Sequence, residues 1–218
     1  APTRKTQWMP MPPRPKLKKE AIVSVAFDHV RRQGWAGLTA RYLSERLGSS
    51  TKPIYFHFRS MHEIESAVIQ KAMDRVLAYT RTPRSGDVWI DQALGVVMFA
   101  IEEKHLFRAI FDERHVSVRK KCSARVWQAG EAQLASYPPF AGLAGHQIEM
   151  VRRARWMFTH GLASLMSISN WPWETAHESL LVELIRRISR AVLSEFREGP
   201  GLMFGKAFLD QTSMAQEP

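Results

Sequence analysis

The chain contains a single cysteine, Cys122, among its 218 residues. A disulfide within the chain and a thiolate metal cluster are therefore excluded, and a reducing compartment is the simplest expectation. Cys122 falls in a segment with helical periodicity. We interpret it as a small buried apolar residue, with a redox sensor as the alternative.

Long hydrophobic segments are also missing. The most apolar run, residues 156–168, has 13 residues and includes a histidine, so it is too short to cross a bilayer and is expected to be a buried helix. The chain begins Ala-Pro-Thr-Arg-Lys and shows no apolar stretch of the kind that a secretory signal carries. A cytoplasmic protein with no membrane partner is therefore expected.

Motifs that support catalysis or metal binding are scarce. No phosphate-binding glycine loop, nucleophile elbow or Ser/His/Asp spacing occurs. Two short segments, residues 102–105 and 112–115, combine acidic residues with a histidine, but neither has the paired histidines of a zinc-binding helix. We interpret both as solvated helix ends, and the sequence predicts no metal, no cofactor and no enzymatic activity.

Positive charge is abundant and unevenly distributed. Residues 1–75 hold 14 Lys/Arg against 6 Asp/Glu, a net charge of +8, out of +10 for the whole chain. A polyanionic partner explains this asymmetry better than a general need for solubility. A basic surface without a nucleic-acid role is the alternative.

The most informative stretch runs from Leu38 to Phe58 and predicts a helix-turn-helix motif. Thr39 can cap the first helix through its hydroxyl, and Gly48 permits the left-handed conformation that ends it. Ser49 or Ser50 can cap the second helix, whose first turn contains a proline. In that helix Ile54 and Phe58 are expected to point into the core, whereas Thr51, Lys52, Tyr55 and His57 are expected to face outwards, toward a DNA major groove.

The flanking residues extend this pattern. An amphipathic helix is predicted over 18–33, ended by Gly34, and Ser60 with Glu63 forms a capping box that starts a fourth helix. Over residues 17–74 the chain resembles the TetR family of bacterial transcription regulators, through the combined pattern G-x3-L-T followed by L-G-x4-P-I-Y-x-H-F. The matching positions are Ala26, Phe27, Gly34, Leu38, Thr39, Arg41, Leu43, Leu47, Gly48, Ser50, Ile54, Tyr55, His57 and Phe58.

The resemblance implies a homodimer that binds a pseudo-palindromic DNA operator, most often as a repressor. Lys52 could donate to guanine near the helix N-terminus, whereas Arg41, Tyr55 and His57 would hold phosphates. The family usually has a phosphate-binding lysine where this chain has Met61, and Arg59 or the capping N–H groups could replace it. The candidate DNA-binding residues are Thr39, Arg41, Ser50, Thr51, Lys52, Pro53, Tyr55, His57 and Arg59.

The rest of the chain shows only helical periodicity, so the predicted fold class is all-α. Further helices are expected over 89–101, 105–111, 116–136, 146–168 and 175–197. The last two are too apolar for one buried face each, which predicts a dimer interface, as the resemblance also implies. A core within one chain is the alternative. The candidate interface residues are Phe158, Gly161, Leu165, Leu181, Ile185, Ile188 and Val192.

Large and polarizable side chains in this helical region favour a hydrophobic or aromatic small-molecule ligand. Most of them must belong to the core, because aromatic residues at helical spacing usually do. His160 is either a hydrogen-bonded core residue or a polar anchor for the ligand. The candidate pocket residues are Trp89, Met98, Phe107, Phe111, Trp127, Trp156 and His160.

The expected organisation is a flexible basic arm (1–17), a helix-turn-helix DNA-binding domain (18–81, motif 39–58), a helical ligand-binding and dimerisation domain (82–198) and a tail (199–218). The hypothesis is a ligand-responsive transcriptional repressor of a bacterial cytoplasm, associated with the nucleoid when bound to DNA. Two alternatives stay open: a DNA architectural protein without sequence preference, and a helical small-molecule-binding protein in which the N-terminal motif is vestigial.

Overall fold

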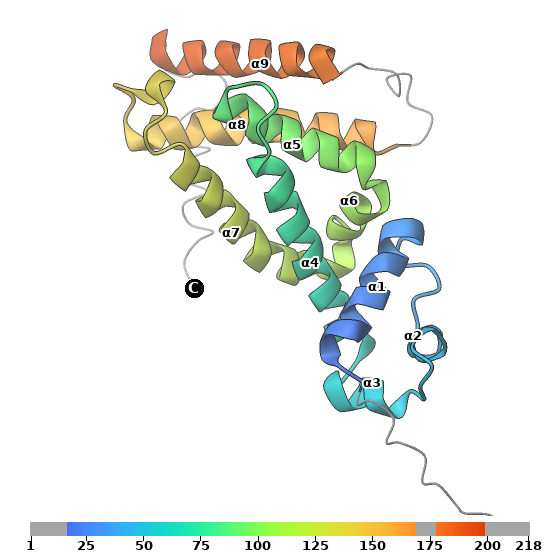
Figure 1. Cartoon of the computed structure of the whole chain (residues 1–218). Coiled ribbons are helices and arrows are strands. Elements are labelled where there is room, and N and C mark those ends of the chain that lie inside the picture. Colours follow the sequence, from blue (N-terminus) through green and yellow to red (C-terminus); the bar gives the residue numbers. More distant parts are fainter. Residues whose placement is uncertain (1–16, 169–177, 199–218) are drawn as a thin grey trace, which may run out of the picture.

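A computed structural model describes residues 17–168 and 178–198, and within these residues it contains helices and no strand, which confirms the all-α prediction (Figure 1). No described helix is both long and apolar enough to span a membrane. The α-helices are α1 (Lys19–Gln33), α2 (Ala40–Arg46), α3 (Lys52–His57), α4 (Met61–Arg81), α5 (Val88–Glu102), α6 (Lys104–Ile110), α7 (Val116–Gln133), α8 (Gly145–Met166) and α9 (Glu178–Glu198), with short 3-10 helices η1 (Glu113–His115) and η2 (Pro138–Phe140).

The helices α1, α2 and α3 pack with the first turns of α4 around a small apolar core. Leu43 of α2 and Ile54 of α3 are fully buried, and they hold the two short helices at a fixed angle to α1. Helices of six or seven residues are unstable in isolation, because nucleation is unfavourable. Their structure therefore depends on these buried contacts more than on local propensity.

The turn between α2 and α3 follows most of the predicted local rules. The Thr39 hydroxyl accepts a hydrogen bond from the Tyr42 N–H at 3.1 Å and so caps α2. Gly48 has a φ of +59°, as a left-handed helix stop requires. The predicted cap of α3 was wrong: the residue before α3 is Thr51, which makes no capping hydrogen bond, while the Ser49 hydroxyl donates to the Ser50 carbonyl.

The long helix α4 connects the N-terminal unit to the remaining helices. It begins at the predicted position, where the Ser60 hydroxyl accepts from the Glu63 N–H at 3.4 Å. The Glu63 carboxylate accepts from the Arg59 N–H rather than from Ser60, so the capping box is only half formed. Near its end α4 crosses α5 closely, and Gly95 of α5 makes this approach possible. Any other residue would place a Cβ only 2.4 Å from the Tyr79 carbonyl oxygen.

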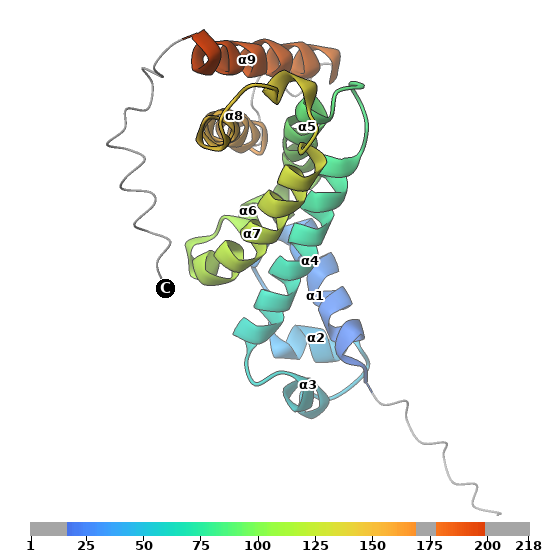
Figure 2. The same ribbon diagram turned by 90° about the vertical axis from the view of Figure 1, so that its left-hand side faces the viewer.

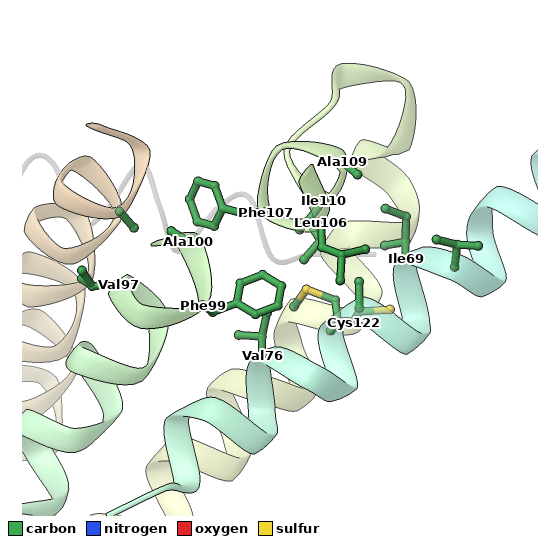
Figure 3. Close-up of a cluster of buried hydrophobic side chains, with 14 of the residues drawn as sticks. Ile69, Val76, Val97, Phe99, Ala100, Leu106, Phe107, Ala109, Ile110 and Cys122 are labelled. Carbon is green, nitrogen blue, oxygen red and sulfur yellow. The ribbon is translucent and has the colours of Figure 1, made fainter. Parts of the chain in front are cut away.

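The helix α5 is the centre of the C-terminal half. It is buried along nearly its whole length, with α4 on one side and α8 and α9 on others, as Figures 1 and 2 show. Phe99 of α5 meets Val76 of α4 and Cys122 of α7 in this core (Figure 3). Burial raises the pKa of the Cys122 thiol, in agreement with its interpretation as a buried apolar residue.

The predicted helix limits agree with the structure to within a few residues. The largest difference is in α7, which ends at Gln133 instead of residue 136. Asp87 caps α5 as predicted, since its carboxylate accepts from the N–H groups of Trp89 and Ile90. The predicted cap at Thr175 lies outside the described residues. The buried core is continuous across residues 81–82, where a domain boundary was predicted.

Candidate nucleic-acid interface

The helix α3 lies at the end of the molecule farthest from α9 (Figures 1 and 2). Ile54 and Phe58 anchor it, at 0% and 3% exposure. The opposite face is accessible to solvent: Thr51 and Lys52 are exposed, and Tyr55 is 51% exposed. The helix therefore presents its polar side outward, as an element that enters a groove must do.

Phe56 is the most exposed large hydrophobic side chain of the described residues, at 85%. Its ring makes an edge contact with the neighbouring His57 ring, at a centroid distance of 5.3 Å. Sequence reasoning missed this residue because it falls between the core positions and the polar positions of α3. A phenylalanine on the outer side of a recognition helix can contact the methyl group of thymine.

The other candidate DNA-binding residues surround α3. Arg41 on α2 is exposed and donates to Glu45 at 3.0 Å, a weak surface ion pair that a phosphate could replace. Ser50 and Arg59 are exposed on either side of α3, and Pro53 is half-buried in its first turn. Met61, at the position of the family's lysine, packs against the core and offers no charge.

His57 differs from the prediction. Its ring is half-buried, and its Nε2 lies 2.7 Å from the carbonyl oxygen of Leu17, just before α1. This hydrogen bond ties the end of α3 to the start of α1. His57 therefore positions the helix, and a phosphate contact through Nε2 would require breaking this bond.

A buried ion-pair cluster, here called the Glu103 clamp, joins the N-terminal unit to the C-terminal helices. Glu103, which is 2% exposed and precedes α6, accepts from Arg31 of α1 at 2.6 Å and from Arg75 of α4 at 2.7 Å. Burial opposes ionisation of Glu103, but the two arginines outweigh it and hold its pKa below the usual range. Sequence reasoning had assigned this residue to a solvated helix end, which was wrong.

Comparison with known proteins agrees with this geometry, although no protein-family model matches the chain. The chain is 35% identical over 74 residues to the tetracycline repressor protein class C of Escherichia coli, and 32% identical over 83 residues to the class A repressor from transposon 1721. These matches cover 34% and 37% of this chain, and 33% and 37% of the repressors.

A solved structure extends the similarity to the fold as a whole. A TetR-family transcriptional regulator from Streptomyces coelicolor matches with a TM-score of 0.60 and 19% identity, over 92% of this chain and all of that regulator. The fold of this chain is therefore similar to that of a TetR-family regulator. The chain spans only about a third of the length of the curated relatives it matches, so the shared fold, and not the activity, is what the full-length comparison establishes.

In the structure the predicted pocket residues separate into two groups. Phe107 of α6 and Phe111, directly after α6, both contact the ring of His160 on α8, and Trp156 stacks on the same ring. We call these four residues the His160 cluster. The His160 ring lies 4.3 Å from Phe111 and 5.3 Å from Trp156, measured between centroids. Burial and the positive charge of Arg119 lower the pKa of His160, which favours its neutral form.

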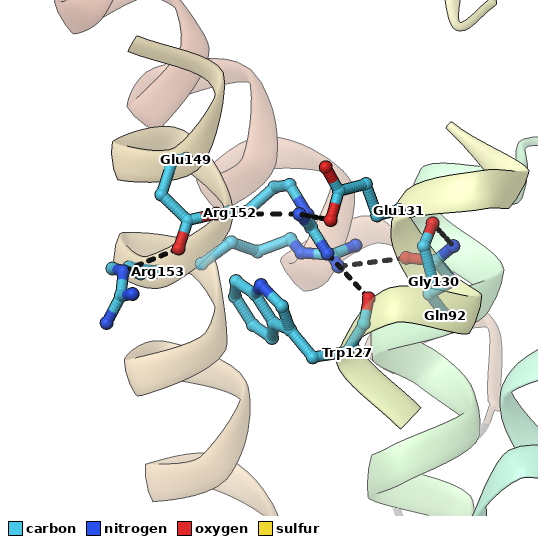
Figure 4. A network of polar contacts seen from close by, with 8 residues as sticks. Gln92, Trp127, Gly130, Glu131, Glu149, Arg152 and Arg153 are labelled. Carbon is cyan, nitrogen blue, oxygen red and sulfur yellow. Dashed lines mark hydrogen bonds and ion pairs between the residues drawn. The ribbon is translucent and has the colours of Figure 1, made fainter. Parts of the chain in front are cut away.

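Two arginines occupy the neighbourhood of the second group, Trp89 and Trp127. Arg152 stacks over Trp127 and donates to its carbonyl oxygen at 2.8 Å, with Glu131 and Glu149 within 3.5 Å (Figure 4). These contacts give the Trp127 ring partners from within the chain. Met98 is half-buried on α5 and packs against the apolar core.

Arg155 is a second buried arginine that sequence reasoning did not single out. Its guanidinium lies 3.3 Å from the Trp89 ring centroid and donates to the Trp89 carbonyl oxygen. Burial, and then repulsion from Arg152, lower the pKa of Arg155 to about 9. Burying such a charge is costly without an ion-pair partner, and the more distant Asp87 carboxylate and the Tyr137 hydroxyl only partly offset this cost.

The predicted interface residues on α8 and α9 also separate. Leu181 and Ile185 are each 1% exposed, because they pack inward where α9 meets α5 and α8. They are unavailable to a partner, which corrects the prediction for these two residues. The remaining predicted residues are exposed or half-buried: Phe158, Gly161, Leu165, Ile188 and Val192.

Proposed function

We propose that this chain is a homodimeric transcriptional repressor that binds a pseudo-palindromic operator through α3 and responds to a small-molecule ligand. The observation that carries the proposal is the outward face of α3, where Lys52 and Tyr55 stand exposed on a helix fixed from below by Ile54 and Phe58. The net charge of +8 over residues 1–75 favours a phosphate backbone as its partner. The tetracycline repressors that the chain resembles support repression.

The side chains of α3 would divide the work of recognition by position. Thr51, Lys52 and Pro53 lie at the N-terminal end, which approaches base edges most closely in this motif. Phe56 would add an apolar contact to a thymine methyl group. Tyr55, with Arg41, would hold phosphates and so fix the register without reading sequence.

Substitutions of Lys52 and Tyr55 test this division. Lys52→Ala should lose about 1–3 kcal/mol of discrimination at one base pair, whereas Tyr55→Ala should weaken binding to operator and scrambled DNA equally. Both side chains are exposed, so neither change should affect folding. Gel shifts on the two DNAs at fixed salt provide the measurement.

If Lys52→Ala lowered the affinity for operator and for scrambled DNA equally, its role in base readout would be contradicted. Lys71→Ala is a matched control, because Lys71 is also exposed but lies on α4 over the ring of Phe27, away from α3. It should leave both affinities within a factor of about 2 of the native chain.

The dimer would form through the outer faces of α8 and α9. Met157, Leu165 and Ile168 on or just after α8, together with Leu180 on α9, are exposed apolar side chains. Gly161 lies between them on α8, and a Cβ added there would meet no neighbouring atom within 4 Å, which leaves space for a close helix from a second copy. Two copies related by a two-fold axis would present two α3 helices to successive turns of DNA.

A ligand would bind beside the His160 cluster, because Phe111 and Trp156 are exposed aromatic rings that pack against the half-buried His160 ring. The helix α6 begins directly after Glu103, carries Phe107 and is followed by Phe111. A ligand that moves α6 would therefore strain the Glu103 clamp and, through Arg31 and Arg75, reorient α1 and α4. A ligand preference of about 1–3 kcal/mol for one arrangement is sufficient for regulation.

A further inference from the structure

Three potential metal ligands lie together where α4 begins and α7 begins. His62 and Glu65 are three residues apart on α4 and share one helical face, and His115 ends η1, directly before α7. One ligand atom from each residue lies within 4.8 Å of the corresponding atoms of the other two. His115 is about fifty positions away from the other two in the sequence, so no sequence motif reveals the cluster.

His115 has no hydrogen-bond partner that would explain its burial. The side chain is 0% exposed, and neither Nδ1 nor Nε2 makes a hydrogen bond. Its Nε2 lies 3.5 Å from the Glu65 carboxylate, too far for a good hydrogen bond. Buried polar groups are nearly always satisfied in native proteins, and an exception calls for a ligand or another explanation.

The surroundings hold the His115 ring in place. Trp35, in the turn between α1 and α2, packs on one side at a centroid distance of 4.7 Å, and His62 stacks at 5.8 Å and 17°. The nearby charges are largely paired with each other, since Arg114 donates to Asp112 at 2.9 Å. His115 is thus confined in orientation, with Glu65 as the only acid within 4 Å of its ring nitrogens among the described ion pairs.

We propose that His62, Glu65 and His115 bind a divalent transition-metal ion of the zinc class. Two imidazoles and one carboxylate suit zinc, cobalt or nickel, whereas magnesium and calcium prefer oxygen ligands alone. At metal–nitrogen distances of about 2.0–2.1 Å, tetrahedral ligand atoms lie roughly 3.4 Å apart. The Glu65 carboxylate is 3.5 Å from His115 and 4.0 Å from His62, and all three ligand atoms lie within 4.8 Å of one another. Closing the site would require the exposed His62 ring to rotate out of its stacked position.

The accessibility of the three residues provides an entry path. His62 is exposed and Glu65 is half-buried, so the ion can reach buried His115 from solvent and keep a water molecule as its fourth ligand. The ion would fasten the first turns of α4, which follow α3 directly, to the start of α7. The binding site itself does not depend on the proposed DNA-binding function.

Cobalt binding to the untagged full-length chain tests the proposal, because Co²⁺ absorbs visible light when it has nitrogen and oxygen ligands from a protein. Titration should show saturable visible bands with one Co²⁺ per chain, and equimolar Zn²⁺ should remove them. His115→Gln and Glu65→Gln should each weaken Co²⁺ binding at least tenfold. His146→Gln is the matched control, since His146 is exposed at the start of α8, and it should bind Co²⁺ like the native chain.

Circular dichroism separates a lost ligand from a lost fold. If His115→Gln fails to fold, His62→Gln provides the same test at an exposed position. This variant should also bind Co²⁺ at least tenfold more weakly than the native chain. The absence of saturable bands in the native chain at millimolar Co²⁺ would overturn the proposal. Native binding by folded Glu65→Gln and His62→Gln would also overturn it.

Discussion

The two halves of this molecule differ in how far their important residues lie apart in the sequence. In the N-terminal unit, the important residues all fall between Thr39 and Phe58. They are the Thr39 cap, the turn glycine Gly48, the buried side chains of Ile54 and Phe58, and the exposed face of α3. In the C-terminal half, several important contacts join distant helices, as when Glu103 pairs with Arg31 at a separation of 72 residues. Local rules can specify the first kind of structure, whereas only tertiary packing specifies the second.

From this difference we expect substitutions at crossings between distant helices to cost more stability than substitutions of local signals. The strongest test is Gly95→Ala, at the crossing of α4 and α5. The added Cβ would meet the Tyr79 carbonyl oxygen at 2.4 Å and Thr80 Cα at 2.7 Å, both backbone atoms that cannot rotate away. The free energy of unfolding should fall by about 3 kcal/mol, as measured by urea denaturation.

Gly130→Ala is the control for Gly95→Ala. Gly130 lies within α7, and a Cβ there would make ordinary contact with Gln92 at 3.5 Å. Since alanine is the better helix former, the control should be neutral or stabilising by up to about 1 kcal/mol. Equal destabilisation by both changes would contradict a specific close crossing of α4 and α5.

The Glu103 clamp should show the next largest effect. Glu103→Gln removes a buried carboxylate from two arginines that are each partly exposed, so unfolding free energy at pH 7 should fall by about 2 kcal/mol. Because the folded pKa of Glu103 is lowered, its contribution is complete above the unfolded pKa of about 4.3 and disappears as pH falls through the folded value.

The difference in stability between native chain and Glu103→Gln should therefore narrow below about pH 4. Glu113→Gln, at an exposed position on η1, is the control and should change stability by less than about 0.5 kcal/mol. If the difference in unfolding free energy between the native chain and Glu103→Gln stayed constant below about pH 4, the charge of the carboxylate would not be what stabilises the clamp.

The local caps should show the smallest effects. Thr39→Ala removes the one hydroxyl that caps α2 and should cost about 1 kcal/mol. Ser50→Ala removes a hydroxyl that was expected to cap α3 but precedes an uncapped helix, so it should cost less than about 0.3 kcal/mol. Thermal unfolding of the two variants under identical conditions compares them. A larger loss for Ser50→Ala would reinstate the original cap prediction.

The same contrast explains how much of the structure could be predicted. The order of the helices, the positions of Gly34 and Gly48, and the burial of Ile54 and Phe58 follow from periodicity and turn chemistry. The exposed residues of α3 followed from the same pattern, except Phe56, whose apolar character argued against exposure.

Tertiary partners explain most of what the sequence did not reveal. Glu103 and His115 lay in segments that resembled solvated helix ends, and no pattern showed that Arg31 and Arg75, or His62 and Glu65, would reach them. Leu181 and Ile185 matched an interface pattern because apolar stripes look alike whether they face the same chain or a partner. His57 was expected to hold a phosphate because of its place on the outward side of α3, and no pattern showed that the Leu17 carbonyl, 40 residues earlier, would contact its ring.

Selection of DNA ligands from a random duplex library by the native chain tests the proposed operator binding most directly. We expect enrichment of an inverted repeat whose half-sites are centred about one helical turn apart or slightly more, roughly 34–36 Å or beyond. We also expect Lys52→Ala to relax the preference at one position of each half-site. Recovery of bound DNA without any common motif, or no binding even at low salt, would contradict sequence-specific recognition by α3.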